Sequence, residues 1–274
     1  MCELLAISSR LPAAITYSLE EFSTNGSKLR SNRDGWGLAL MRDLDAFIIK
    51  EAKPASDSVW VKFAAENAIA TTFAMAHVRY ATRGNHTMEN THPFRRVLGR
   101  RPHLFAHNGT LDGLDELAKR EPPAFLPIGE TDSELAFCML LTRLQAHYRD
   151  GETPPLDVRF EVFRETCAHL GALGPSNFLY HDGDVLMAHA HKRIYEENDE
   201  LVGPKPPGLH LKNFRECSHH HKLSSPGLDV EVQHQQTAIL ASVPLDDEAW
   251  EDLDEGTVLA IKDGDILKRG SSLA

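Results

Sequence analysis

Residues 1–8 read Met1-Cys2-Glu3-Leu4-Leu5-Ala6-Ile7-Ser8, a mostly apolar run with a cysteine at its second position. This composition predicts a short buried strand, so we expect the chain to start inside the fold. Because Cys2 is a small second residue, we expect methionine aminopeptidase to remove Met1 and to leave a thiol and a free α-amine on one residue. Such an amine has a reference pKa of about 7.7–8.0 and can accept the thiol proton. The simpler interpretation is that Cys2 is a small core residue.

Beyond this strand, apolar runs alternate with turn signals and predict a layered fold. We expect strands at residues 36–41 and 46–50, as a hairpin, and at 72–80, 103–107, 177–180, 185–191, 237–243 and 256–267. We expect helices at residues 57–70, after Thr131 and at 158–170, and a further helix opened by Pro12 and closed by Asn25-Gly26. Strands, then helices, then strands favour an α+β arrangement of layers over a repeated βαβ unit.

The chain shows no internal repeat and no linker, so we expect one domain over residues 2–274. Within it, residues 196–235 are rich in proline, glycine and histidine and predict an irregular excursion from the sheet.

Composition argues against several classes of function. The chain has 274 residues, 42% of them hydrophobic, and a formal net charge of -11, which disfavours a nucleic-acid-binding surface. One short basic cluster (Arg95, Arg96, Arg100 and Arg101) is interpreted as a solvated turn, with nucleic-acid contact as the lesser alternative. No apolar run is long enough for a membrane helix, and the first residues lack the pattern of a signal peptide, so we expect a cytoplasmic protein.

The cysteines and histidines give weaker signals. The cysteines after Cys2 (Cys138, Cys167 and Cys217) are too scattered for a disulfide framework, and we expect the first two to be buried in helices. The run Cys217-Ser218-His219-His220-His221, with His210 and His234, lacks a standard zinc spacing, so we expect no metal site and interpret residues 210–221 as a surface or substrate-cleft loop.

Three motifs later in the chain each suit one part of an amino-acid amide. In His77-Val78-Arg79-Tyr80-Ala81-Thr82, the planar guanidinium of Arg79 can hold a carboxylate through two hydrogen bonds. In His107-Asn108-Gly109, a carboxamide and a backbone N–H supply two oxyanion donors. In Thr131-Asp132-Ser133-Glu134, Asp132 can hold an ammonium group.

Each motif also has a plain structural alternative. Arg79 suits an ordinary ion pair, Asn108-Gly109 a type I′ turn, and Asp132 a helix cap. We expect the histidines inside or beside the motifs (His77, His92 and His107) to make structural hydrogen bonds, because an amine-based mechanism needs no histidine base. Together with Cys2, however, the motifs supply a nucleophile, oxyanion donors and two charge clamps.

In this order the motifs closely resemble the class II glutamine amidotransferase domain, one of the N-terminal nucleophile hydrolases. The resemblance implies that Cys2 is the nucleophile, that Asn108 and Gly109 form the oxyanion hole, and that Arg79, Thr82 and Asp132 bind the glutamine carboxylate and α-amino group. The segments Asp34-Gly35-Trp36-Gly37-Leu38, Asn90-Thr91-His92-Pro93-Phe94 and Leu240-Ala241-Ser242-Val243-Pro244-Leu245 match further family segments. The implied fold is a four-layer αββα sandwich, with two antiparallel sheets between helical layers.

The short stand-alone members of this family are the most similar, because larger members append an acceptor domain. The resemblance implies hydrolysis of glutamine without a cofactor, with ammonia passed to a separate synthase or acceptor subunit. Two alternatives remain: hydrolysis of a γ-glutamyl amide or peptide without ammonia transfer, and a catalytically silent glutamine-binding regulatory subunit. The chain departs from the sugar-phosphate-making members at Arg83, where they have histidine, and at Ser31-Asn32, where they have Arg-Gly.

Overall fold

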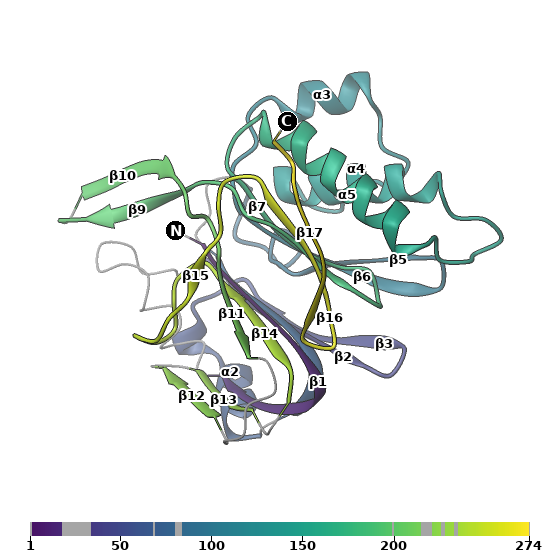
Figure 1. Cartoon of the computed structure of the whole chain (residues 1–274). Helices are drawn as coiled ribbons and strands as arrows, with labels where there is room; N and C mark the ends of the chain where they lie inside the picture. Colours follow the sequence, from purple (N-terminus) through teal and green to yellow (C-terminus); the bar gives the residue numbers. More distant parts are fainter. Residues whose placement is uncertain are drawn as a thin grey trace.

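The computed structural model describes residues 2–17, 34–67, 69–79, 84–198, 200–214, 221–225, 228–232 and 235–273. Within these residues, two antiparallel sheets lie face to face and helices cover their outer faces, as Figure 1 shows. This arrangement confirms the predicted α+β sandwich.

The first sheet contains the start of the chain. Its strands run in the order β15-β11-β14-β1-β4-β2-β3, and β13 pairs with the second half of β1 and with β12. The bounds are β1 Glu3–Tyr17, β2 Trp36–Arg42, β3 Asp45–Glu51, β4 Ile69–Val78, β11 His210–Phe214, β12 His221–Ser225, β13 Leu228–Val232, β14 Thr237–Ala241 and β15 Glu251–Asp252. Strand β1 therefore lies inside the sheet, between β4 on one side and β14 and β13 on the other.

The second sheet has the order β17-β16-β8-β7-β6-β5. Its bounds are β5 Phe94–Leu98, β6 Arg101–Gly109, β7 Ser176–His181, β8 Leu186–His189, β16 Thr257–Lys262 and β17 Asp265–Ser271. A separate hairpin, β9 Arg193–Glu197 and β10 Glu200–Lys205, projects from the sandwich in Figure 1.

Helices form the two outer layers. Helices α3 Leu114–Arg120, α4 Asp132–Gln145 and α5 Leu156–Gly171 cover the second sheet, while η1 Ala55–Asp57 and α2 Val59–Glu66 lie on the side of the first sheet (Figure 1). The Thr131 side chain accepts a hydrogen bond from the Glu134 backbone N–H at 3.2 Å, which starts α4 where the sequence predicts.

Strand alternation decides which side chains face the space between the sheets. Leu4 and Ala6 of β1 lie in the same buried cluster as Leu104 and Ala106 of β6, whereas Leu5 and Ile7 lie in the cluster on the other face of β1. Cys2 has the same parity as Leu4, so alternation directs it toward the second sheet. The two sheets thus bring the first residues of β1 to the last residues of β6.

Most predicted strands and helices are confirmed, but the helix expected to open at Pro12 is wrong. Strand β1 continues to Tyr17, with a register shift against β4 between Ser8 and Ala13. Pro12 falls inside this shift, where a missing backbone N–H does not interrupt the ladder. The predicted end of that helix at Asn25-Gly26 lies outside the described residues. The helix predicted over residues 57–70 ends earlier, because β4 begins at Ile69.

The segment 196–235 is more regular than predicted. It contains β10, and β11 pairs with β14 as part of the first sheet. Lys212 in β11 obscured the strand pattern, because its buried ammonium group is paired with Asp246 at 2.7 Å and with Glu248 at 2.6 Å. The rest of the segment includes β12 and β13, while residues 215–220, 226–227 and 233–234 lie outside the described part of the chain.

Candidate active site

Cys2 and Asn108 meet where the two sheets come together. The Asn108 carboxamide Nδ2 donates a hydrogen bond to the Cys2 backbone carbonyl at 2.7 Å. Asn108 is buried and lies in β6, whereas Cys2 precedes β1 and is partly exposed. Residues 106 positions apart are therefore in direct contact.

Asn108 and Gly109 are held in the last two positions of β6, so they form no type I′ turn. The Asn177 side chain donates to the Asn108 carbonyl at 3.0 Å and to the Lys192 carbonyl at 2.7 Å, which fixes the Asn108 backbone. A Cβ atom at Gly109 would lie 1.8 Å from the Pro175 carbonyl oxygen. Only glycine fits there, because a backbone passes too close for any side chain.

Arg79 follows the end of β4 and is also buried, with 3% of its surface exposed. Its guanidinium donates to the Asn85 carbonyl at 3.1 Å and to the Gly84 carbonyl at 3.4 Å. Burial lowers the pKa of Arg79, and negative charge on Cys2 and Asp34 acts in the opposite direction. The Cys2 thiol thus lies within electrostatic range of the guanidinium. Thr82 lies outside the described residues.

Asp132 is the first residue of α4, and its carboxylate is buried. One carboxylate oxygen accepts from the Leu111 N–H at 2.7 Å and the other from the Ser133 N–H at 2.9 Å. The N-cap residue is Thr131, so Asp132 is not the cap. The contact with Leu111 holds the carboxylate against the segment that follows Asn108 and Gly109.

Asn90 joins the loop that carries the Arg79 contacts to the loop that leads into Asp132. Its carboxamide oxygen accepts from the Glu130 N–H at 2.8 Å, and its Nδ2 donates to the Asn85 carbonyl at 3.2 Å. The two charged groups expected to bind the ends of an amino acid are thus linked through a single buried side chain.

A family model described as class II glutamine amidotransferases matches residues 1–273. The chain belongs to the class II glutamine amidotransferases. YafJ of Escherichia coli (strain K12), provisionally named a glutamine amidotransferase, is 35% identical over 196 residues, which are 71% of this chain and 75% of that protein. The uncharacterized protein MJ1515 of Methanocaldococcus jannaschii is 29% identical over 267 residues, 97% of this chain and 71% of that protein.

Solved structures agree with this assignment. A crystal structure of a predicted glutamine amidotransferase from Pseudomonas aeruginosa superposes with a TM-score of 0.70 at 26% identity, over 97% of this chain and all of that one. Glutamine phosphoribosylpyrophosphate amidotransferase from B. subtilis gives a TM-score of 0.60 at 15% identity, over 99% of this chain and 49% of that one. The second comparison supports the fold alone.

Several residues to which the sequence analysis gave no role also contact the candidate site residues or their neighbours. The Ser242 hydroxyl accepts from the Leu4 N–H at 3.1 Å and from Asn108 Nδ2 at 3.3 Å. Arg193 of β9 donates to the Ser242 carbonyl and, at 3.1 Å, to the Glu3 carboxylate. No sequence pattern identifies these contacts, because their partners are 49 to 238 residues apart.

The histidines of the motifs differ from one another. His107 makes the predicted structural contacts, with Ser133 Oγ at 2.9 Å and the Pro175 carbonyl at 3.0 Å. For His92 the prediction of hydrogen bonding is wrong, because its ring nitrogens have no partner among the described residues. The His77 ring interacts with the backbone of His107, which acts against the effect of burial on its pKa. The His77 and His92 rings lie 4.2 Å apart between packed elements, and burial lowers the pKa of His77 to about 3. Both rings are therefore neutral.

The remaining cysteines of the described chain are unsuited to catalysis. Cys138 and Cys167 are buried in α4 and α5, as predicted, and burial raises the pKa of Cys138 to about 11. A thiol with such a pKa is protonated near neutrality and is a weak nucleophile. Cys217 and the adjacent His219-His220 lie outside the described residues.

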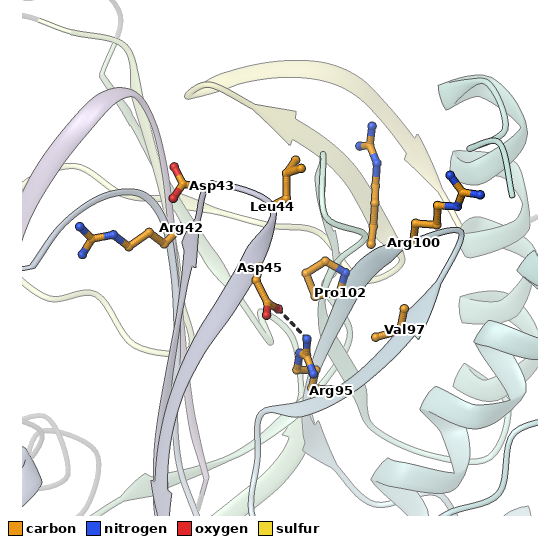
Figure 2. Close-up of a pocket in the computed structure, with 9 residues that line it drawn as sticks. Arg42, Asp43, Leu44, Asp45, Arg95, Val97, Arg100 and Pro102 are labelled. Atoms are coloured by element: carbon orange, nitrogen blue, oxygen red, sulfur yellow. Dashed lines mark hydrogen bonds and ion pairs between the residues drawn. The ribbon is translucent and has the colours of Figure 1, made fainter.

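The basic cluster spans the β5–β6 hairpin: Arg100 lies in its exposed turn, as predicted, while the other members lie in the strands and make ion pairs. Arg95 pairs with Asp45 at 2.5 Å, and Arg96 pairs with the buried Glu134. A groove of about 370 Å³ lies beside them, at the opposite end of β6 from Asn108. Figure 2 shows Arg95 engaged with Asp45, while the Arg42 and Arg100 side chains point away from the gap. These guanidinium groups therefore do not converge on a common ligand position.

Among the described residues, no cluster of three or more histidine, cysteine, aspartate or glutamate side chains is placed to hold a metal ion; His210 instead contacts Asp252 at 2.7 Å. No helix among the same residues has the length and apolar character needed to cross a membrane.

Proposed function

We propose that this amidotransferase hydrolyses the γ-carboxamide of glutamine, or of a related γ-glutamyl compound, through a thioester on Cys2. The observation that carries the proposal is the 2.7 Å contact between Asn108 Nδ2 and the Cys2 carbonyl, which puts the expected oxyanion donor beside the expected nucleophile. The burial of Arg79 and Asp132 nearby supports recognition of an amino acid by its two charged ends.

Binding precedes chemistry in this proposal. Arg79, with Thr82, holds the α-carboxylate, and Asp132 holds the α-ammonium group. A substrate fixed at these two points extends its side chain toward Cys2. Because the clamps and the nucleophile belong to different loops and strands, substrate orientation depends on the packing of the whole site.

The first chemical step forms the thioester. In the mature chain the Cys2 amine takes the thiol proton, and the sulfur attacks the amide carbon. Asn108 Nδ2, which exchanges one of its two present acceptors for the substrate oxygen, and the Gly109 N–H stabilise the negative charge that develops on the carbonyl oxygen. The carbon–nitrogen bond then breaks, the protonated amine returns the proton to the leaving nitrogen, and ammonia or an amine departs.

The second step releases the product. A water molecule loses a proton to the Cys2 amine and attacks the thioester carbon. The carbon–sulfur bond breaks, the thiol regains its proton, and glutamate or its γ-acid equivalent leaves. The net reaction consumes one water and needs no cofactor.

The leaving group decides between the two enzymatic alternatives. In one, the substrate is free glutamine and a separate synthase or acceptor subunit of the cytoplasm uses the ammonia. In the other, the substrate is a γ-glutamyl amide or peptide and nothing is transferred. The retention of Cys2 with both charge clamps argues against a silent glutamine-binding subunit.

The test is an assay of glutamate release from glutamine and from a series of γ-glutamyl amides, with wild type and the Cys2→Ala variant. We expect release by wild type and none by the variant. Glutamine binding without any glutamate formation by wild type would contradict the proposal and favour the silent subunit.

A further inference from the structure

Glu3 occupies an unusual place for a charged residue. It follows the proposed nucleophile directly, and only 2% of its surface is exposed. Burial raises its pKa, and the charge of Arg193 acts in the opposite direction. A buried carboxylate without a partner is strongly unfavourable, so the contact with Arg193 is what makes this position tolerable.

Arg193 reaches Glu3 from outside both sheets. It begins β9, whose only strand partner in the described chain is β10, and it is 4% exposed. One terminal nitrogen donates to Glu3 Oε1 at 3.1 Å and the other to the Ser242 carbonyl. A single guanidinium therefore ties together the residue after Cys2, the residue after β14, and the projecting hairpin of Figure 1.

Ser242 continues this connection to the oxyanion donor. Its N–H donates to the Leu4 carbonyl at 3.0 Å, and its hydroxyl accepts from the Leu4 N–H at 3.1 Å. The same hydroxyl accepts from Asn108 Nδ2 at 3.3 Å. Ser242 thus contacts both the strand that carries Cys2 and the carboxamide that faces it.

The Glu3–Arg193 pair is poorly optimised for stability. Glu3 Oε2 and Arg193 Nε are both buried and have no hydrogen-bond partner among the described residues. A buried pair with unsatisfied atoms is often less stable than apolar side chains of the same volume. The contacts of this pair do, however, restrain the start of β1, where Cys2 must be aligned with Asn108.

We propose that Glu3, Arg193 and Ser242 are positioning residues, which hold the start of β1 in register with Asn108 so that the Cys2 sulfur and the oxyanion donors act on one carbonyl group. This inference rests on the proposed function. It assigns to the β9–β10 hairpin the task of delivering Arg193 to the nucleophile strand. The substrate clamps Arg79 and Asp132 belong to other elements, so positioning and binding are separable.

The experiment compares Glu3→Gln, Arg193→Gln and Ser242→Ala with wild type in glutamate release. We expect kcat to fall roughly 10- to 100-fold, because displacement of reacting groups by about 1 Å has effects of that size. We expect KM to stay unchanged, since the clamps are intact. Arg193→Lys should restore part of kcat, because an ammonium group can pair with Glu3 but lacks the fork that also reaches Ser242.

The control is Arg159→Gln. Arg159 lies in α5, is as buried as Arg193, and pairs with Asp182 and, at 3.1 Å, with Asp184. We expect this variant to lower the melting temperature and to leave kcat unchanged.

A second readout is the rate of Cys2 alkylation by iodoacetamide, followed by peptide mass spectrometry, because alkylation needs an accessible thiol but no oxyanion donors.

The inference predicts lower kcat with an unchanged alkylation rate. If Glu3→Gln does not fold, Ser242→Ala gives the same test with a smaller change. The inference is overturned if the variants keep wild-type kcat and lose only stability, as the control does, or if kcat and alkylation fall together. A wild-type protein that releases no glutamate from any γ-glutamyl amide overturns the proposed function, and this inference with it.

Discussion

At the scale of single residues, the candidate site depends on buried polar side chains. Asn108, Arg79 and Asp132 are all buried, yet each uses its polar atoms on backbone groups of the neighbouring loops and strands. These contacts hold the side chains in place before a substrate arrives, which reduces the reorganisation that binding requires.

Cys2→Ala should abolish glutamate release, because it removes the proposed nucleophile and leaves only alanine at the same position. Intact-mass analysis of the active wild-type protein should show that Met1 is absent. A fully active protein that retains Met1 would contradict the amine-based mechanism, whatever the result for the alanine variant.

Asn108→Ala should lower kcat by roughly 10²- to 10³-fold, since one oxyanion donor contributes about that much in other acyl-transfer sites. Asn67→Ala is the control, because Asn67 is an exposed residue at the end of α2. Turnover close to that of wild type in the Asn108 variant would exclude Asn108 from the oxyanion role.

Arg79→Lys should raise KM for glutamine by roughly 10- to 100-fold, because a hydrogen bond to a charged group contributes about 1.5–3 kcal/mol and a lysine cannot form the planar fork. Arg143→Lys should leave KM unchanged, because Arg143 of α4 pairs with Glu121 and has no assigned role in the candidate site. An unchanged KM for the Arg79 variant would show that the carboxylate is held elsewhere.

Sequence alone identified Cys2, Arg79, Asn108 and Asp132 as candidates, because their residue types and order suit one substrate. It gave no role to Arg193, and it gave none to Ser242 although Ser242 lies in a segment that matches the family. Ser242 is placed by strand pairing across more than two hundred residues, such as Leu5 with Ala241, and Arg193 lies in the β9–β10 hairpin. Only the folded chain shows that these residues touch the candidate site.

At the scale of elements, the geometry of the site depends on the start of β1, the ends of β4 and β6, the loop over residues 84–93 and the loop that leads into Asp132. The loop over residues 84–93 packs onto β2 so closely that a Cβ atom at Gly37 would lie 2.0 Å from the His92 carbonyl oxygen. The glycine therefore permits the approach that holds the Gly84 and Asn85 carbonyls against Arg79.

Gly37→Ala should destabilise the protein by about 1–3 kcal/mol, the usual effect of an extra group in a packed interior, and should raise KM by moving this loop. Gly270→Ala in β17 is the control, because its Cβ atom would make only an ordinary contact, 3.4 Å from Phe160. Urea unfolding and glutamine kinetics measure the two effects. Unchanged stability and KM would show that the loop adapts without affecting Arg79.

The same scale shows where sequence patterns succeed and fail. The hairpin of β2 and β3 and helices α4 and α5 were predicted because periodicity and capping agree at those positions. The helix predicted to open at Pro12 is a strand instead, because pairing of β1 with β4 and β13 overrides the local helix signal. Strand β11 was missed because its buried lysine is paired with residues that a strand pattern cannot reveal.

At the scale of the whole molecule, the described interior contains several neutral histidines. Burial lowers the pKa to about 3 for His77 and His189 and to about 4 for His103 and His181. In the unfolded chain these groups bind protons below about pH 6.5, whereas the folded protein does not bind them until the pH is much lower. The contribution of these neutral histidines to the free energy of unfolding is therefore fully present above pH 6.5 and is lost as the pH falls toward 4.

The free energy of unfolding should accordingly decrease by about 1.4 kcal/mol per pH unit for each of these histidines once the pH is below 6.5. Urea unfolding between pH 7.5 and pH 5 measures the slope. His103→Gln should reduce that slope by about 1.4 kcal/mol per pH unit, which corresponds to one proton fewer bound on unfolding. A free energy of unfolding that stays constant across this range would contradict the assignment of neutral buried rings.

The place of β1 in the middle of the first sheet has a consequence for biosynthesis. Its partner β14 begins at Thr237, so during translation at about 5–20 residues per second the ribosome needs roughly 10–50 s to supply that partner after the N-terminus is made. Until then, the first residues cannot be enclosed by the completed sheet. The emerging polypeptide therefore offers an interval in which a peptidase can reach Met1, as the proposed mechanism requires, before the C-terminal part of the chain completes the sheet.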